Sequence, residues 1–412
     1  MLKQKIFVER KFHNYIDLKL LIPVLLLTII GLMSIYSATV DSIMSSEFSN
    51  QLTSFILSLI ALIFFLFLPE KTLRPASIYL YFISIIGLIA VLLFGKEVYG
   101  TKGWLSIGGK SIQPAEFAKF SLILIYGYIF SNINVSIKHL RVLITVLIVT
   151  FLPVSLILLQ PDVGTATVIL ATFIGLLYWT GVNTLLIFLI ISTPIILIMS
   201  LKGLTSLIIV LSIFAIITFF FKNKLYIKVL IITLAVLISL SSPLIYESLA
   251  SHQKARIQNI LDPESADKLK SGYNVTQSVL AVGSGGLIGK GYMQGTQTQL
   301  RYIPKQWTDF IYSVPAEEFG FLGSVIILLL YYLLFSRLLY ISIITKSRFF
   351  SVVIFASFSL FLYHFIINIG MVLGLTPVMG IPLPFLSYGG SAMIVYYSLI
   401  GLALNAYRRF KF

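Results

Sequence analysis

Long apolar runs follow one another along almost the whole chain, and short polar stretches separate them. A helix that crosses the hydrocarbon core of a bilayer needs about 20 mostly apolar residues. The pattern therefore predicts an all-α polytopic membrane protein with about twelve transmembrane helices, or ten if two weakly separated segments between 163 and 246 are miscounted. The predicted spans are 18–38, 51–68, 76–94, 113–130, 141–159, 163–181, 184–200, 204–221, 226–246, 316–345, 350–374 and 384–407.

The largest polar interruption covers residues 247–315, before the last three predicted spans. A membrane protein that places many of its few charges in one loop is expected to handle a polar ligand there. The charged residues of interest in this loop are Asp262, Glu264, Asp267, Asp309, Lys254, Arg256, Lys290, Arg301 and Lys305.

Two other stretches depart from the pattern of ordinary spans. Residues 95–115 are rich in Gly and Lys and contain Trp104, which suits an interfacial segment. Residues 374–391 are apolar but contain three prolines within eight positions. Proline removes amide donors and breaks helices, so we expect an irregular or re-entrant segment that is buried in protein or lines a cavity open to the outside.

Composition supports the membrane class and bounds the partners. The chain has 412 residues, 58% hydrophobic and 11% charged, whereas a soluble domain carries roughly a quarter charged residues. The net charge of +15 comes from Lys and Arg in short loops, as the positive-inside rule expects, so no nucleic-acid partner is predicted. The positions of these Lys and Arg residues predict that both termini are cytoplasmic and that the loop 247–315 is outside. The apolar run 18–38 is predicted to be an uncleaved first span.

Cysteine and histidine usage narrows the chemistry further. The chain contains no cysteine, which excludes disulfides and thiolate metal sites. Its four histidines are scattered without ligand spacing, so a zinc site is not expected.

Several polar residues lie at or inside the predicted spans. Glu116 and Lys119 are three residues apart and share one helix face, where they can neutralise each other. A charge pair at a helix end is the simpler interpretation, but the cost of burying charges in a membrane favours a functional cavity. Helix capping explains Asp162 well. His364 and Asn368, one turn apart, are expected to form an interhelical hydrogen-bond pair.

The loop itself offers two candidates for chemistry. The glycine string 283–291 lacks the Gly and Ser/Thr positions of a phosphate loop, so it predicts either plain turn structure or close contact with another backbone or a ligand. Asp262 precedes a proline and suits either a turn or a general base. Desolvation would raise its pKa towards the range of a base, and the nearby Lys254 and Arg256 would oppose that shift.

Five ordered motifs carry a resemblance to a known family: QPAEFAK, QPDVGTA, the block from ARIQNILDPESAD to GSGGLIGKG, TDFIYSVPAEEFG and GIPLPFLSYGGS. Together they resemble the SEDS proteins of shape, elongation, division and sporulation, from about residue 17 to 410. The motif GTQTQL at 295–300 is more similar to the elongation (RodA-like) members than to the division members. The region 163–246 is longer than the family's ten-span pattern, which predicts two added spans.

The resemblance implies a single integral-membrane domain over 1–412, with 247–315 as its extracytoplasmic catalytic loop. It implies a peptidoglycan glycosyltransferase that polymerises lipid II on the outer face of the cytoplasmic (inner) membrane. The implied partners are a class B penicillin-binding protein and the elongation machinery. A flippase for lipid-linked precursors and a non-catalytic scaffold are the alternatives.

The resemblance also implies roles for individual residues. Asp262 matches the family's loop aspartate, the proposed general base, and Glu116 and Lys119 match its charged pair; these three are the catalytic candidates. Lys119, Arg256 and Lys290 are expected to stabilise the departing pyrophosphate. No cofactor is implied with certainty, and Mg²⁺ or Mn²⁺ is a candidate aid to that step. The substrate-binding candidates are Arg256, Lys290, Trp104, Asp309 and Gln113.

Overall fold

The structure, a computed structural model, describes residues 16–40, 46–98, 101–107, 110–131, 137, 139–248, 254 and 272–411. A helix coincides with each of the twelve predicted spans. These are α1 (Leu18–Thr39), α2 (Ser46–Phe67), α3 (Glu70–Phe94), α4 (Pro114–Ile129), α5 (Leu140–Leu158), α6 (Val163–Trp179), α7 (Thr184–Lys202), α8 (Leu204–Phe220), α9 (Leu225–Leu240), α14 (Ser313–Ile344), α15 (Arg348–Val372) and α16 (Gly390–Lys411).

Length and composition identify the chain as a multi-pass membrane protein. Among the described residues, eight helices are long and apolar enough to cross a membrane. Three more apolar helices, α6, α8 and α9, are shorter. The helix α4 has 16 residues and carries the two charges Glu116 and Lys119. Many large apolar side chains on these helices are exposed, as expected of a surface that meets lipid.

Local sequence signals set where several helices begin. Asp17 and Asp162 cap α1 and α6, and each carboxylate accepts a hydrogen bond from a backbone N–H of the first turn. Pro114 stands at the first position of α4, where its missing N–H costs nothing. The predicted span 384–407 is corrected: α16 begins at Gly390, because the proline-rich stretch before it is irregular, as its composition indicates.

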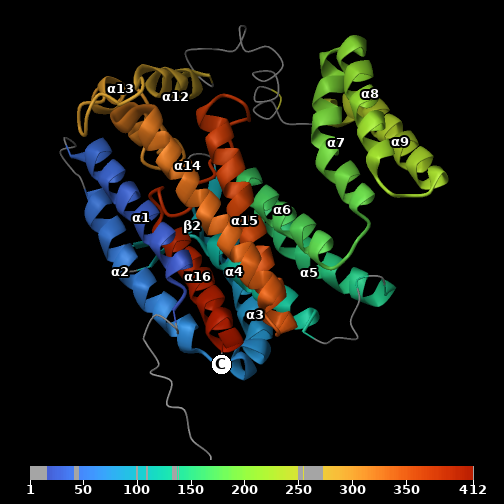
Figure 1. Cartoon of the computed structure of the whole chain (residues 1–412), viewed down its shortest axis with the longest axis horizontal. Coiled ribbons are helices and arrows are strands. Elements are labelled where there is room, and N and C mark those ends of the chain that lie inside the picture. Colours follow the sequence, from blue (N-terminus) through green and yellow to red (C-terminus); the bar gives the residue numbers. More distant parts are fainter. Residues whose placement is uncertain are drawn as a thin grey trace, which may run out of the picture.

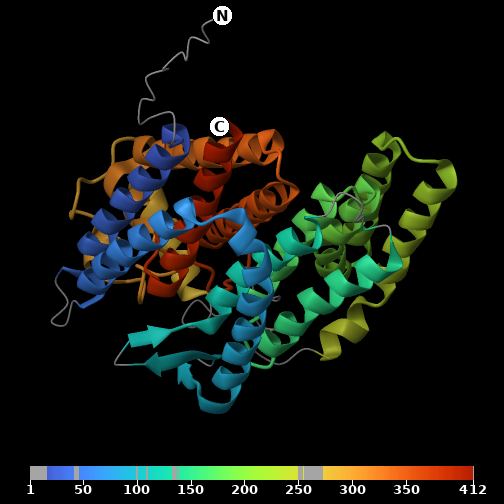
Figure 2. The ribbon, with the colours of Figure 1, turned by 90° about the horizontal axis from the view of Figure 1, so that it is seen from below.

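A small antiparallel sheet, which the sequence did not predict, accompanies the helices of this helical membrane fold. It consists of β1 (Lys96–Val98), β2 (Thr101–Ile107) and β3 (Lys110–Ile112), in the order β1-β2-β3. Leu105 is paired with Ile112, and apolar residues of this kind suit a half-buried strand. The sheet joins α3 to α4 and projects from the helices (Figure 2). Because this stretch is rich in Gly and Lys, its strands could not be recognised from the sequence.

The main core is built from α1, α2, α4 and the last three helices (Figure 1). Asp17 at the start of α1 forms an ion pair with Arg337, at 2.5 Å, whereas Ser37 near its end contacts Glu318. Thus α1 and α14 are antiparallel. Near the end of α16, Asn405 donates to the carbonyl oxygens of Phe65 and Leu68 at the end of α2. The end of α2 and the start of α1 lie at the same end of the bundle, so the end of α16 lies there too (Figure 1).

Three helices form a separate unit beside this bundle. The helices α7, α8 and α9 pack on one another around their own small apolar core, and α7 connects them to α6 (Figure 1). Phe188 stacks on Phe214 within this core at a centroid distance of 4.9 Å. The unit lies where the sequence predicts two added spans. After it come α10 (Ser242–Ser248), α12 (Tyr273–Ser284) and α13 (Thr296–Gln299).

Candidate functional site

A buried ion pair lies in the first turns of α4. Lys119 Nζ is 2.7 Å from Glu116 Oε1, and the two side chains are only 2% and 5% exposed. The other carboxylate oxygen, Glu116 Oε2, is buried and has no hydrogen-bond partner among the described residues. Buried charges are costly in a membrane and normally have all their hydrogen bonds satisfied. The unsatisfied oxygen therefore marks this pair as a candidate site for a ligand or a proton.

His364 connects this pair to the irregular proline-rich segment. Its Nε2 lies 3.5 Å from Lys119 Nζ, and its Nδ1 lies 2.9 Å from the carbonyl oxygen of Pro382. A neutral imidazole that donates from Nδ1 and accepts at Nε2 satisfies both contacts. Tyr396 Oη also lies 3.3 Å from Nδ1. Sequence analysis did not place His364 in the site, because its partner Lys119 is 245 residues away along the chain.

Asn368 also binds the irregular segment. Its amide donates to the carbonyl oxygens of Ile381 and Asp309, at 2.8 and 2.7 Å. The interhelical hydrogen bonds expected of His364 and Asn368 thus lead from His364 to Lys119 on α4 and from both residues to backbone carbonyls outside α15. Together they attach α15 to the irregular segment and to the residues before α14.

The irregular segment, residues 373–389, is buried over most of 381–387, whereas residues near its start, such as Leu375, are exposed. A Cβ on Gly31 would lie 2.6 Å from the carbonyl oxygen of Leu386, and one on Gly164 would lie 2.2 Å from that of Met379. Gln51 accepts from the backbone N–H of Gly389 at 3.1 Å. The second half of this segment is thus surrounded by protein, which is one of the two settings expected for it. The functional cavity expected around Glu116 and Lys119 is not open to solvent among the described residues, since both side chains are buried.

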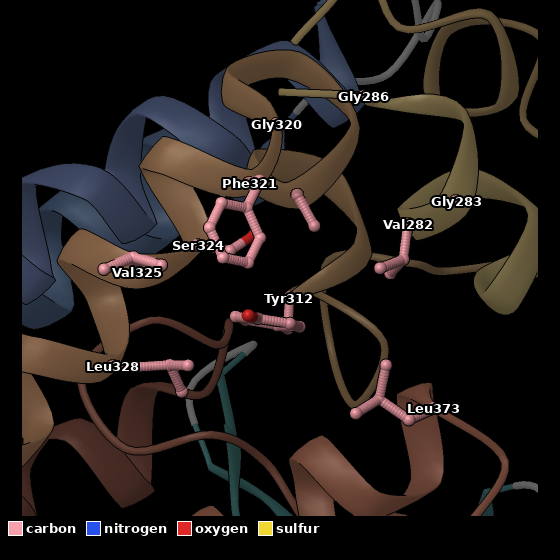
Figure 3. A pocket seen from close by; sticks show the side chains of 11 residues that line it. Val282, Gly283, Gly286, Tyr312, Gly320, Phe321, Ser324, Val325, Leu328 and Leu373 are labelled. Carbon is pink, nitrogen blue, oxygen red and sulfur yellow. The ribbon is translucent and has the colours of Figure 1, made fainter. Parts of the chain in front are cut away.

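A pocket of about 260 Å³ lies elsewhere, between α12, α14 and the end of α15 (Figure 3). Its wall is almost entirely apolar, with hydroxyl groups from Tyr312 and Ser324. Gly320, which has φ +64°, breaks α14 at this point. The pocket is separate from the Glu116–Lys119 pair, because neither residue lines it.

Two of the predicted substrate-binding residues lie near the start of α4. The backbone N–H of Gln113 donates to Ser391 Oγ at 3.3 Å, and its side-chain amide lies 3.4 Å from Asp162 Oδ2. Trp104 is partly exposed on β2, in register with Lys96. Gln113 thus joins the starts of α4, α6 and α16, three elements whose motifs are far apart in sequence.

Asp309 lies in the segment before α14. Thr308 Oγ1 donates to its carboxylate at 2.9 Å, while its carbonyl accepts the bond from Asn368. Burial raises the pKa of Asp309 above its ordinary value, and the hydrogen bond from Thr308 opposes this shift. Asp309 therefore lies close to the irregular segment, because Asn368 of α15 binds the carbonyl oxygens of both Asp309 and Ile381.

The remaining predicted residues divide into two groups. Lys290 forms an ion pair with Glu317, with Nζ 2.8 Å from Oε1. Asp262 and Arg256 lie outside the described residues, so their predicted roles stay predictions. Among the described side chains, no group of three or more His, Asp and Glu residues is placed to hold a metal ion.

The glycine string packs against backbone. A Cβ on Gly285 would lie 2.2 Å from the carbonyl oxygen of Ala316, and one on Gly289 would lie 2.1 Å from that of Glu318. The backbone N–H of Gly291 donates to Glu318 O at 3.0 Å. The sequence left open whether this string forms plain turns or contacts another backbone or a ligand. Close contact with the backbone of α14 explains why Gly285 and Gly289 are glycines.

Comparison with known structures defines the class of protein. The fold matches a chain from a structure titled as the structural coordination of polymerization and crosslinking by a peptidoglycan synthase complex. The TM-score is 0.73 at 25% identity, over 96% of this chain and 98% of that one. It also matches the rod shape determining protein RodA of Thermus thermophilus, with a TM-score of 0.62 at 23% identity, over 95% and 97% of the two chains. The chain thus has the RodA-like membrane fold.

The sequence identifies the family. Residues 18–206 and 193–411 match the model of the family described as cell cycle protein, which covers FtsW, RodA and SpoVE. The chain belongs to this family, as its five motifs predict. It is 32% identical to the peptidoglycan glycosyltransferase MrdB of Escherichia coli K12, over 96% of this chain and 95% of MrdB. It is 31% identical to the peptidoglycan glycosyltransferase RodA of Treponema pallidum, over 94% and 96% of the two chains.

Proposed function

We propose that the chain is a peptidoglycan glycosyltransferase that polymerises lipid II during cell elongation. The observation that carries this proposal is the buried Glu116–Lys119 pair, in a chain that matches named peptidoglycan glycosyltransferases along nearly its whole length. The motif GTQTQL at 295–300 supports elongation over division. A polymerase of lipid-linked sugars has reason to be mostly membrane, because the polyprenyl tail of its substrate stays in lipid.

The reaction requires one base and several cations. Asp262 takes the proton from the 4-hydroxyl of the acceptor sugar, and that oxygen attacks the anomeric carbon of the donor. The bond from this carbon to the pyrophosphate oxygen breaks as the new glycosidic bond forms, with inversion and without an enzyme nucleophile. Lys119 and Arg256 stabilise the negative charge on the departing polyprenyl pyrophosphate. Trp104, Gln113 and Asp309 are proposed to contact substrate.

The distribution of basic residues supports an orientation in the membrane. Arg408 lies over the ring of Phe67, and Arg409 over that of Phe350, so both arginines lie where α2 ends and α15 begins. Figure 1 shows this end of the bundle, marked C, opposite α12 and α13. By the positive-inside rule this end is cytoplasmic. Loop 247–315 and the active site then face the outside of the cytoplasmic membrane.

A class B penicillin-binding protein is the proposed partner. The structural relative from a peptidoglycan synthase complex, in which polymerization and crosslinking are coordinated, supports such a partner. Such a protein would supply the transpeptidase that crosslinks the glycan strands.

Labelled lipid II incubated with the purified chain, alone and with its partner, tests the function. Glycan strands are the expected product. Translocation of lipid II across a liposome membrane without polymer would favour a flippase, and neither activity would favour a scaffold. Asp262→Asn is expected to abolish polymerisation without preventing purification of the protein. Full activity of this variant would refute the assignment of the base.

A further inference from the structure

Glu317, in the first turns of α14, accepts hydrogen bonds from several residues of the loop. Its Oε1 accepts from Lys290 Nζ at 2.8 Å and from the backbone N–H of Gln297 at 2.9 Å. Its Oε2 accepts from Thr298, through the backbone N–H at 2.9 Å and through Oγ1 at 2.7 Å. The side chain is 0% exposed. Both oxygens are satisfied, so this carboxylate has little capacity left for a ligand.

The ammonium group of Lys290 is equally occupied. Its Nζ donates to Glu317 Oε1, to Ser284 Oγ at 2.8 Å and to Thr296 Oγ1 at 2.7 Å. An ammonium has three N–H donors, and here each has an acceptor. None remains for a pyrophosphate unless the ion pair breaks.

The same segment is attached to two helices. The backbone N–H of Lys290 donates to Glu317 O at 3.1 Å, so main chain and side chain both bind the start of α14. The amide of Gln299 donates to Ser37 Oγ on α1 at 3.0 Å. Residues 284–299 are therefore held between α1 and the broken part of α14.

Further contacts extend from this segment to the buried pair on α4. The Gln306 amide donates to the carbonyl oxygen of Thr298 at 2.8 Å. The next residue, Trp307, accepts at its carbonyl from the N–H of Tyr388, in the irregular segment, at 2.9 Å. That segment is the one that His364 binds while it also contacts Lys119. The position of residues 284–299 is thus connected through hydrogen bonds to the position of Lys119.

We propose that Lys290 and Glu317 form a clamp that positions the C-terminal half of loop 247–315 relative to the Glu116–Lys119 pair. Both are positioning residues, and Lys290 acts through Glu317 instead of contacting the pyrophosphate. This inference rests on the proposed function for its effect on activity, and on the contacts alone for its effect on the loop. It also gives the GTQTQL motif a physical role, since Thr296, Gln297 and Thr298 are the groups that bind Glu317.

The absence of cysteine from the chain allows a direct test. Ile303 is 1% exposed and lies just beyond the clamped segment, so the thiol of Ile303→Cys reports whether the loop is docked. Leu300 is 64% exposed, and Leu300→Cys is the matched control that labels in either state. The full-length protein in detergent is treated with a maleimide, and lipid II polymerisation is measured on the same samples.

Three variants, Lys290→Met, Glu317→Gln and the double substitution, are compared in each cysteine background. Each is expected to raise the labelling rate of I303C by about tenfold and to leave L300C unchanged, because a lost charge-assisted contact shifts the docking equilibrium on that scale. Polymerisation kcat falls by a similar factor, with a smaller change in KM. The double variant is expected to lose little more than either single variant, since the two residues act as one unit.

Two results would overturn the clamp. Lys290→Met with weak polymerisation and unchanged I303C labelling would mean that the ammonium contacts substrate directly. Losses that multiply in the double variant would mean that the two residues act separately. If Glu317→Gln is not monodisperse, Lys290→Met decides the question alone. A parent chain that makes no glycan would refute the proposed function, while the labelling rates would still test the clamp.

Discussion

Two acid–lysine pairs lie in the part of the chain that the structure describes, and they differ in how completely their hydrogen bonds are satisfied. In the Lys290–Glu317 pair, both carboxylate oxygens and all three ammonium donors have hydrogen-bond partners. In the Glu116–Lys119 pair, whose side chains are 5% and 2% exposed, Glu116 Oε2 has no hydrogen-bond partner among the described residues.

This difference distinguishes a pair with a structural role from a pair that can bind a ligand. A satisfied buried pair gains nothing from a ligand, because binding would have to break existing bonds. An unsatisfied buried oxygen gains a hydrogen bond when a ligand or a proton reaches it. We therefore propose that the pair on α4 interacts with the substrate and that the pair at the start of α14 positions the loop.

Removing the charge of Glu116 should have the largest effect. Glu116→Gln is expected to lower lipid II polymerisation by at least about a hundredfold, the scale for losing one group that stabilises a transition state. It should leave I303C labelling near the parent value, because the clamp is intact. Initial rates of glycan formation measure the loss of polymerisation, and maleimide labelling of I303C measures whether the loop stays docked. Wild-type polymerisation by Glu116→Gln would remove the distinction between the pairs.

Gly289 tests the close packing beneath the clamp. Gly289→Ala should destabilise the protein by about 2–4 kcal/mol, because its Cβ would overlap Glu318 O and its φ of +87° disfavours a side chain. Gly283→Ala is the control, since nothing lies within 4 Å of its Cβ, and its change should be within about 0.5 kcal/mol. Thermal unfolding in detergent measures both. Equal stability of the two variants would contradict the packing.

His364 is expected to position Lys119, with a smaller effect. Glutamine can place an acceptor near the position of Nε2, whereas asparagine can place a donor near that of Nδ1. If the contact with Lys119 matters, His364→Gln should retain about tenfold more polymerisation than His364→Asn, the scale of one hydrogen bond to a charged group. The opposite order would assign the role of His364 to its bond with Pro382.

Asp309 should give the smallest effect, on the pH dependence of stability. Its pKa is raised above the ordinary 3.8, so from that pH up to the raised value the folded chain binds more protons than the unfolded chain. Its contribution to stability is therefore present at low pH and is lost as pH rises through this window. Asp309→Asn lacks this loss, so its Tm should rise relative to the parent by a few degrees at most over the same window. A difference in Tm that stays constant with pH would contradict the raised pKa.

Hydropathy was sufficient to locate the twelve helices, because each must bury its backbone polar groups within an apolar run. It missed the sheet at 96–112, whose strands are too short and polar to stand out. It also placed the start of the last span too early, although the prolines in that stretch indicated irregular backbone.

The site was only partly predictable, for a different reason. The spacing of Glu116 and Lys119 revealed their pairing, since neighbours on one helix face are fixed by local geometry. In contrast, Glu317, the partner of Lys290, and His364, which also contacts Lys119, lie on other elements, 27 and 245 residues away. Charge and composition show that Lys290 is a cation, but its place in an ion pair follows only from the tertiary packing of the glycine string on α14.

The measurement that tests the central claim most directly is polymerisation by the double variant Glu116→Gln/Lys119→Met. Removing both charges avoids leaving one buried without its partner, so the protein should remain folded. I303C labelling at the parent rate would establish that the loop is docked. We predict that this folded variant makes no detectable glycan from lipid II. A folded variant that polymerises lipid II at the parent rate would contradict the assignment of this pair to the substrate.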